Sequence, residues 1–71
     1  MYIIGSLSLN KYLKDFFVKD SHVTHELTSA KKDAKTFDSL SNAQDTLDML
    51  TFECRILGFS IIELGSGNYA V

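Results

Sequence analysis

The strongest pattern of apolar and polar positions runs from Ser41 to Leu57. Apolar residues recur there at spacings of four, three, four and three, and this core stripe consists of Ala43, Leu47, Leu50, Cys54 and Leu57. Such spacing is typical of a helix that packs one face on a core. Ser41 and Gln44 have the spacing of a capping box, and Gly58 is a suitable stop. The pattern predicts a helix over residues 41–57 whose core stripe is buried.

Short stretches rich in β-branched and aromatic residues predict strands on both sides of this helix. Residues 59–64 are apolar on both faces, which predicts a central strand or one whose second face is covered by another segment. Tyr2, Ile3 and Ile4 begin a first strand, and residues 23–27 alternate as a half-exposed strand should. Residues 69–71 fit either a ragged last strand or a frayed end.

Residues 11–19 fit two patterns. As a helix they would be capped by Asn10; as a strand they would place Tyr12, Phe16 and Val18 on one face and Leu13 and Phe17 on the other. The aromatic and β-branched content favours the strand.

The segment from Lys19 to His22 predicts a hairpin turn into the next strand. Residues 29–34 predict one helical turn capped by Ser29, and residues 35–37 predict a short extended piece.

Together these elements predict a single α+β domain over residues 1–71. We expect a small antiparallel sheet of three to five strands with one main helix packed on it, in the order β-β-β-(β)-α-β. A chain of 71 residues buries only about 60% of the surface that its unfolded form exposes, so its stability should be low. A disulfide within the chain is excluded because Cys54 is the only cysteine.

Composition narrows the classes of partner. The hydrophobic content of 45% and the charged content of 23% are those of a globular domain, and the net charge of −2 does not provide the basic surface that phosphate contacts require. The first residues lack a signal-peptide pattern, and no apolar run is long enough to cross a bilayer. The lone thiol fits a reducing compartment. We therefore expect a cytoplasmic protein without membrane contact.

The residues able to carry chemistry do not form a recognisable centre. His22 and His25 are three positions apart, so a strand points them to opposite faces, away from a common metal ion. Cys54 lies in the core stripe, where a free cysteine acts as a small hydrophobe. Gly65, Ser66 and Gly67 predict a turn, without the residues of a phosphate loop. We expect no metal, no cofactor and no enzymatic activity.

Lys31, Lys32 and Lys35 form a small basic cluster interrupted by Asp33. A solvated face explains it most simply. The alternative is a small nucleic-acid-associated regulator that uses these three lysines.

A second apolar stripe on the predicted helix consists of Met49, Phe52 and Ile56, on the side away from the core stripe. One sheet covers only one side of a helix. The second stripe is therefore covered by the loop containing Leu7 and Leu9 together with residues 69–71, or by a second copy in a homodimer, or by another protein. We predict Met49, Phe52 and Ile56 as partner-binding anchors, since methionine and phenylalanine are enriched at interfaces.

The order Tyr2-Ile3-Ile4, Lys11-Tyr12-Leu13, residues 33–39, an amphipathic helix and residues 58–63 resembles small uncharacterised proteins encoded by bacteriophages and prophages of Gram-positive bacteria. The loop at residues 5–10, with its two leucines, departs from that pattern. The resemblance implies a curled antiparallel sheet with one helix and no catalytic activity. It also implies a non-enzymatic phage-type accessory protein that binds a host or phage protein, for host takeover or inhibition of a bacterial defence system.

Overall fold

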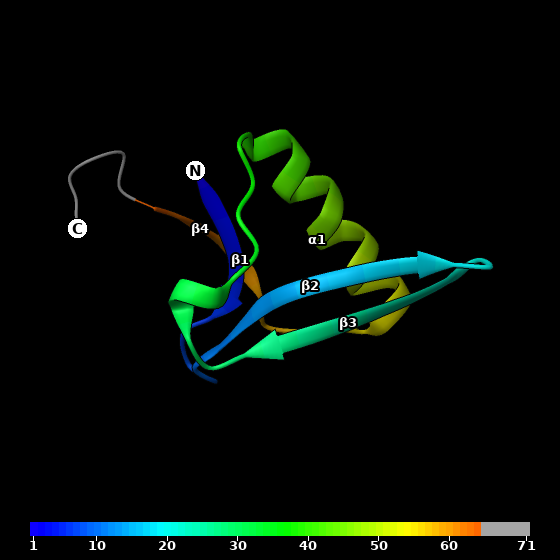
Figure 1. Ribbon diagram of the computed structural model, residues 1–71, viewed down its shortest axis with the longest axis horizontal. Helices are drawn as coiled ribbons and strands as arrows, with labels where there is room; N and C mark the ends of the chain where they lie inside the picture. The colour runs from blue at the N-terminus through cyan, green and yellow to red at the C-terminus, as the bar shows by residue number, and fades with distance from the viewer. Residues whose placement is uncertain (65–71) are drawn as a thin grey trace.

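The computed structural model describes residues 1–64 and has the α+β fold expected (Figure 1). The elements in chain order are β1 (Tyr2–Ser6), β2 (Lys11–Lys19), β3 (His22–Thr28), the 3₁₀ turn η1 (Lys31–Asp33), α1 (Leu40–Cys54) and β4 (Ser60–Glu63). The four strands form one antiparallel sheet in the order β3-β2-β1-β4. The turn expected at Gly65, Ser66 and Gly67 and the end expected at residues 69–71 lie outside the described residues.

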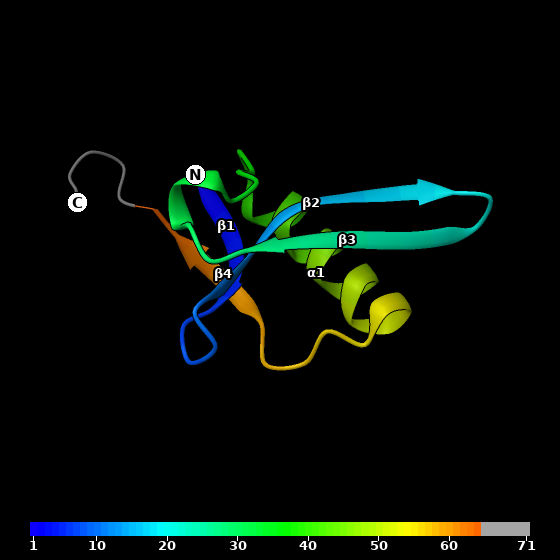
Figure 2. The same cartoon turned by 60° about the horizontal axis from the view of Figure 1, so that its bottom comes forward.

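The main core lies between α1 and one face of the sheet. The helix packs against β1, β3 and β4, and Figures 1 and 2 show β1 and β4 running across the direction of β2 and β3. The buried members of the main core are Ile4, Leu13, Phe37, Ala43, Leu50 and Ile56. A smaller cluster contains Ile3, Tyr12 and Ala34, with Ile62 and Leu64 packed beside it.

No helix within residues 1–64 is long and apolar enough to span a bilayer.

Strands β1 and β2 pair over a very short distance and then diverge. Gly5 pairs with Tyr12 and Ser6 with Lys11. Beyond this point the connection before α1 takes the place of a neighbouring strand: Phe37 exchanges two backbone hydrogen bonds of 2.8 Å with Tyr2. The backbone N–H of Lys35 donates to the carbonyl of Leu13 at 2.8 Å. The extended piece predicted at residues 35–37 is therefore confirmed, and it fills the space between the two strands.

Residues 11–19 form a strand, and a β-bulge at Lys14 changes which side chains share its faces. Leu13 pairs with Leu27, whereas Asp15 pairs with Glu26, so Lys14 is an extra residue on β2. The bulge brings Leu13 and Phe16 into the same core, although strict alternation had placed them on opposite faces. Tyr12 belongs to the other cluster, so the predicted grouping of Tyr12 with Phe16 was wrong.

The predicted hairpin turn between β2 and β3 is confirmed. Asp20 and Ser21 have φ angles of 51° and 65°, and a two-residue type I′ turn needs positive φ at both positions. The helical turn expected near Ser29 is only the 3₁₀ turn η1, preceded by Ala30 without a side-chain cap. The Ser29 hydroxyl instead accepts from Lys11 Nζ at 3.1 Å.

Helix α1 begins and ends earlier than the sequence predicted. Ser39 is its N-cap, because its Oγ accepts from the backbone N–H of Asn42 at 3.1 Å, so the capping box of Ser41 and Gln44 was wrong. The helix ends at Cys54, and Arg55 turns the chain with a left-handed conformation. This turn directs Ile56 into the core and leaves Leu57, expected in the core stripe, 75% exposed.

Strand β4 lies at the edge of the sheet, so the prediction that residues 59–64 form a central strand was wrong. The alternative prediction, that another segment covers the second face of this strand, is the one that agrees with the structure. Ile61 packs on the main core and Ile62 on the smaller cluster, which explains why both faces of this strand are apolar.

Leu50→Ala should lower the free energy of unfolding by about 2–5 kcal/mol, because the wild-type side chain is fully buried and its loss leaves a cavity. Leu57→Ala is the matched control and should change stability by less than about 0.5 kcal/mol. Urea unfolding followed by circular dichroism measures both. Equal losses in the two variants would show that the end of α1 is placed incorrectly.

Gly5→Ala should destabilise the fold by about 1–3 kcal/mol, because a Cβ at this position would lie 2.5 Å from Cδ1 of Tyr12 and force the ring to move. In a Tyr12→Leu background, without the ring, the same change should cost less. A double-mutant cycle from thermal melts measures this coupling. Additive effects would contradict the contact.

Candidate functional site

The three residues predicted as anchors do not share one surface. Phe52 is 79% exposed on the outer side of α1, and Met49 is half-buried. Ile56 is only 8% exposed and belongs to the main core, so its predicted surface position was wrong. The reason is the left-handed turn at Arg55, which ends the helix before Ile56 can continue the stripe.

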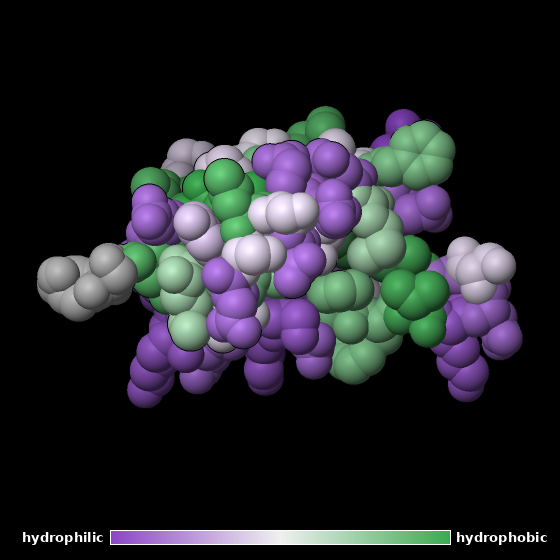
Figure 3. All heavy atoms as spheres, turned by 90° about the horizontal axis from the view of Figure 1, so that it is seen from above, coloured by the Kyte–Doolittle hydropathy of each residue, from purple (hydrophilic) through white to green (hydrophobic). Residues whose placement is uncertain are grey.

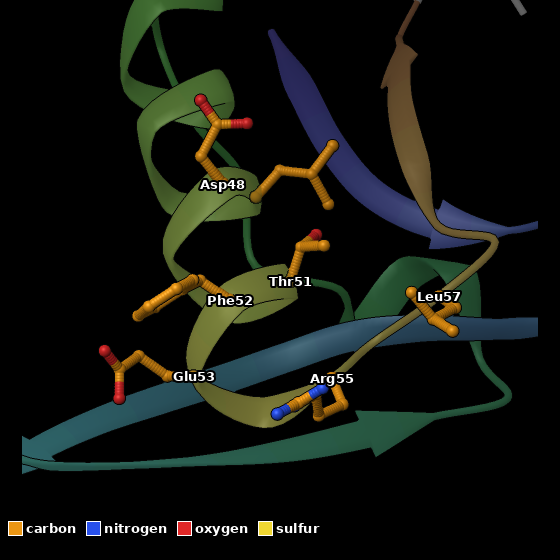
Figure 4. Close-up of a pocket in the computed structure, with 7 residues that line it drawn as sticks. Asp48, Thr51, Phe52, Glu53, Arg55 and Leu57 are labelled. Atoms are coloured by element: carbon orange, nitrogen blue, oxygen red, sulfur yellow. The ribbon is translucent and has the colours of Figure 1, made fainter.

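Beside Phe52, the end of α1 and the connection to β4 enclose an open groove of about 710 Å³. Figure 4 shows Asp48 and Arg55 at two ends of this region, with Thr51 between them and Leu57 reaching toward it from the connection. Phe52 and Glu53 project from the opposite side of the same helix turn. The full lining is Leu47, Asp48, Thr51, Phe52, Glu53, Arg55 and Leu57. The site is thus an apolar recess with charged groups at its margin.

The margin of this groove carries both signs of charge. Asp48 Oδ1 accepts a hydrogen bond of 2.9 Å from Gln44 Nε2, one turn earlier on the helix. Within residues 1–64 neither Asp48 nor Arg55 forms an ion pair, and the one salt bridge found there joins Lys35 to Asp15. These two opposite charges are available to a binding partner.

Arg55 is held in a conformation that favours glycine. Its φ of 57° and ψ of 35° lie in the left-handed region, which costs a residue with a Cβ roughly 1 kcal/mol. Its side chain is exposed and therefore gains little from packing. The sequence does not indicate that the helix ends at Arg55, because arginine is not a typical left-handed C-cap. The residue that typically ends a helix is glycine, and the nearest one is Gly58.

Cys54 occupies the last position of α1 rather than the middle of a buried stripe. It is half-buried, and its Sγ donates to the carbonyl of Val23 at 3.4 Å. On β3, His22 is exposed and pairs with Lys19, whereas His25 is half-buried and pairs with Phe16. Residues 1–64 contain no group of three or more His, Cys, Asp or Glu side chains placed to hold a metal ion.

The predicted lysine cluster is divided in the fold. Lys31 and Lys32 are exposed on η1, but Lys35 is directed to β2. Its Nζ lies 3.7 Å from Asp15 Oδ1 and 5.7 Å from the centre of the Phe16 ring. Because Lys35 is engaged within the chain, the exposed ammonium groups of the cluster that have no ion pair within residues 1–64 are those of Lys31 and Lys32, a small surface for phosphate contacts.

The loop that was a candidate cover for the second stripe does not cover Phe52. Leu7 and Leu9 are themselves exposed at the tip of a tight turn, which is held by Leu9 N–H donating to Ser6 Oγ at 3.3 Å. The other candidate cover, residues 69–71, lies outside the described residues. Figure 3 shows apolar areas separated by polar side chains on the face that it presents.

No family model, no curated protein and no solved structure matches this chain.

Arg55→Gly should raise the melting temperature by several degrees, because relieving the left-handed strain gains about 1 kcal/mol in a domain of this size. Arg55→Ala is the control that removes the guanidinium and keeps the strain, so its melting temperature should not rise. Differential scanning calorimetry compares the two. A glycine variant that melts no higher than the alanine variant would contradict the assigned conformation.

Proposed function

We propose that this chain is a non-enzymatic accessory protein that acts by binding another protein through the groove and Phe52. The observation that carries the proposal is the exposure of a phenylalanine at the rim of an apolar recess. Large aromatic side chains exposed beside a recess are typical anchors of protein interfaces.

The structure revises the anchors on which the proposal rests. Phe52 remains, Leu57 joins it from the connection to β4, and Ile56 is withdrawn because it stabilises the core. Met49 is half-buried, so only part of its side chain is accessible to a partner. The resemblance to phage and prophage proteins supports a host or phage protein as partner, in host takeover or in inhibition of a bacterial defence system.

A photo-crosslinking amino acid at position 52 tests the site in the cells that produce the protein. Phe52 tolerates an enlarged aromatic side chain because it is exposed. The same probe at Leu40, which is exposed at the start of α1, is the control. The proposal requires a protein adduct from position 52 that position 40 does not give and that excess unlabelled protein suppresses.

Phe52→Asp should weaken capture of the protein identified in this way while the domain stays folded. The change places a charge in solvent, so circular dichroism should remain native, and losing an aromatic anchor worth about 2 kcal/mol should weaken binding about 30-fold. Leu40→Asp should retain binding, as measured by titration calorimetry. A folded Phe52→Asp protein with wild-type affinity would remove the basis of the proposal.

A further inference from the structure

The second half of β2 is an open edge of the sheet. Strand β1 pairs with β2 only at Lys11 and Tyr12, and the N–H of Lys35 donates to the carbonyl of Leu13. Beyond this point, residues 14–19 have no backbone partner within residues 1–64 on the side away from β3. In Figure 2 this part of β2 has β3 on one side and no other described segment on the other. Such an edge is a template for pairing with a further strand.

The backbone groups on this edge follow from the hairpin geometry. Its two-residue turn makes Lys19 and His22 a hydrogen-bonded pair, and such pairs alternate with non-hydrogen-bonded pairs along the ladder. The N–H and carbonyl groups of Phe16 and Val18 therefore point away from β3. The N–H of Phe16 agrees with this direction, because it donates to Asp15 Oδ1 at 2.8 Å. The carbonyl of Phe16 and both backbone groups of Val18 can bond to an incoming strand.

The side chains on this edge are complementary to the same sequence read in reverse. Residues 15–19 are in turn acidic, aromatic, aromatic, aliphatic and basic. All of them belong to β2 and lie beyond the bulge at Lys14, so they alternate regularly between the two faces. Two such strands laid antiparallel, with a twofold axis between the central residues, match opposite charges and match apolar side chains. The pairs are Asp15 with Lys19, Phe16 with Val18, and Phe17 with its symmetry mate.

We propose that the open edge of β2 is occupied by β2 of a second copy of this chain, in an antiparallel, twofold-symmetric homodimer. A twofold interface uses the same patch on both copies, so that patch must be complementary to itself. The sheet then continues from one copy into the other through the outward backbone groups of Phe16 and Val18. This edge is separate from the residues that line the groove beside Phe52, so the inference goes beyond the proposed function.

The arrangement accounts for two exposed apolar side chains. Phe17 is 50% exposed and Val18 is 60% exposed, although both are in the middle of a paired strand. At the twofold axis Phe17 forms a non-hydrogen-bonded pair, in which facing side chains are closest and an aromatic pair is stabilising. Val18 lies on the α1 side of the sheet, as Phe16 does, and in the dimer it packs beside Phe16 of the other copy.

The charges on the opposite face also favour this neighbour. Asp15 is paired with Glu26 across the hairpin, and like charges directly opposite each other are destabilising. The one ion pair found within residues 1–64 gives Asp15 a single cation, Lys35 at 3.7 Å. Lys19 is exposed and has no ion pair in that part of the chain. In the dimer Lys19 of each copy lies beside the two carboxylates of the other.

Other registers lose this match. A shift of the pairing by two residues in one direction sets Lys19 opposite Phe17, and in the other direction it sets Asp15 opposite Phe17. A shift by one residue turns the outward backbone groups of one strand toward groups of the other that already bond to β3. A parallel arrangement in the same register places like charges side by side.

The paired segment is short, so the dimer should be weak. Interfaces below the standard size are usually transient, and we expect a dissociation constant above about 1 µM. Sedimentation equilibrium from about 10 µM to about 1 mM covers this range, and added salt should shift the equilibrium toward monomer. A wild-type protein that remains monomeric throughout the range overturns the proposal.

A charge exchange between two variants tests the register. Asp15→Lys alone sets lysine against lysine, and Lys19→Asp alone sets aspartate against aspartate, so each should associate at least about tenfold more weakly than the wild type. An equimolar mixture restores both pairs and should dimerise, as should the double variant Asp15→Lys/Lys19→Asp. Glu63→Lys makes the same change in charge as Asp15→Lys but lies on β4, so it should dimerise like the wild type. A mixture that associates no more than its components contradicts the register.

Amide hydrogen exchange on the unmodified protein keeps the result independent of the variants' stability. The N–H of Val18 should exchange more slowly as the protein concentration rises, because it is bonded only in the dimer. The N–H of His25 points away from β2 at the other edge of the hairpin and is the control, whose exchange should not depend on concentration. Circular dichroism verifies that each variant is folded. Protection that grows at another edge and not at Val18 would overturn the proposal.

Discussion

Gly5 and Tyr12 form the contact on which the arrangement of the sheet depends. The two residues face each other across β1 and β2, and the Tyr12 ring occupies the space that a side chain at position 5 would need. An aromatic ring that covers a glycine on the neighbouring strand protects its backbone and fixes the pairing. Since β1 and β2 pair only here and at Ser6, this contact is the hinge from which both strands diverge.

The divergence of these strands makes room for the rest of the core. Residues 35–37 enter the gap and form backbone hydrogen bonds with the N–H and the carbonyl of Tyr2 and with the carbonyl of Leu13. Phe37 thereby reaches the main core beneath α1, while the preceding Ala34 packs in the smaller cluster. The connection therefore links the two clusters, and Ser39 then starts α1 over the sheet.

The sequence contains enough information for the elements and too little for their exact ends. Apolar periodicity identifies α1 because Leu50 and Ala43 must both be buried, and Asp20 with Ser21 identifies the hairpin turn. The bulge at Lys14 has no sequence signal, since it depends on Leu13 and Phe16 reaching the same core.

The same distinction holds for the site. Angular position alone indicated that Phe52 faces away from the core, and the structure places it there. The prediction for Ile56 was wrong because a helical angle gives the direction of a side chain only while the helix continues. The helix α1 ends before Ile56, at a left-handed residue that is an arginine and not the expected glycine. Leu57 was missed for the converse reason, because it was counted on the buried face of a turn that does not form.

The pairing of β1 with β4 has a consequence for the order in which the domain assembles. Tyr2 pairs with Glu63, so this strand pair closes a loop of about 60 residues, whereas β2 and β3 are joined by a two-residue turn. Contacts that are distant in the chain form late, because their loop-closure entropy must first be offset. We expect the hairpin and α1 to associate early and β4 to dock last. The least stable part of the native domain is then β4, whose detachment would uncover Ile61 and Ile62 while the hairpin stays paired.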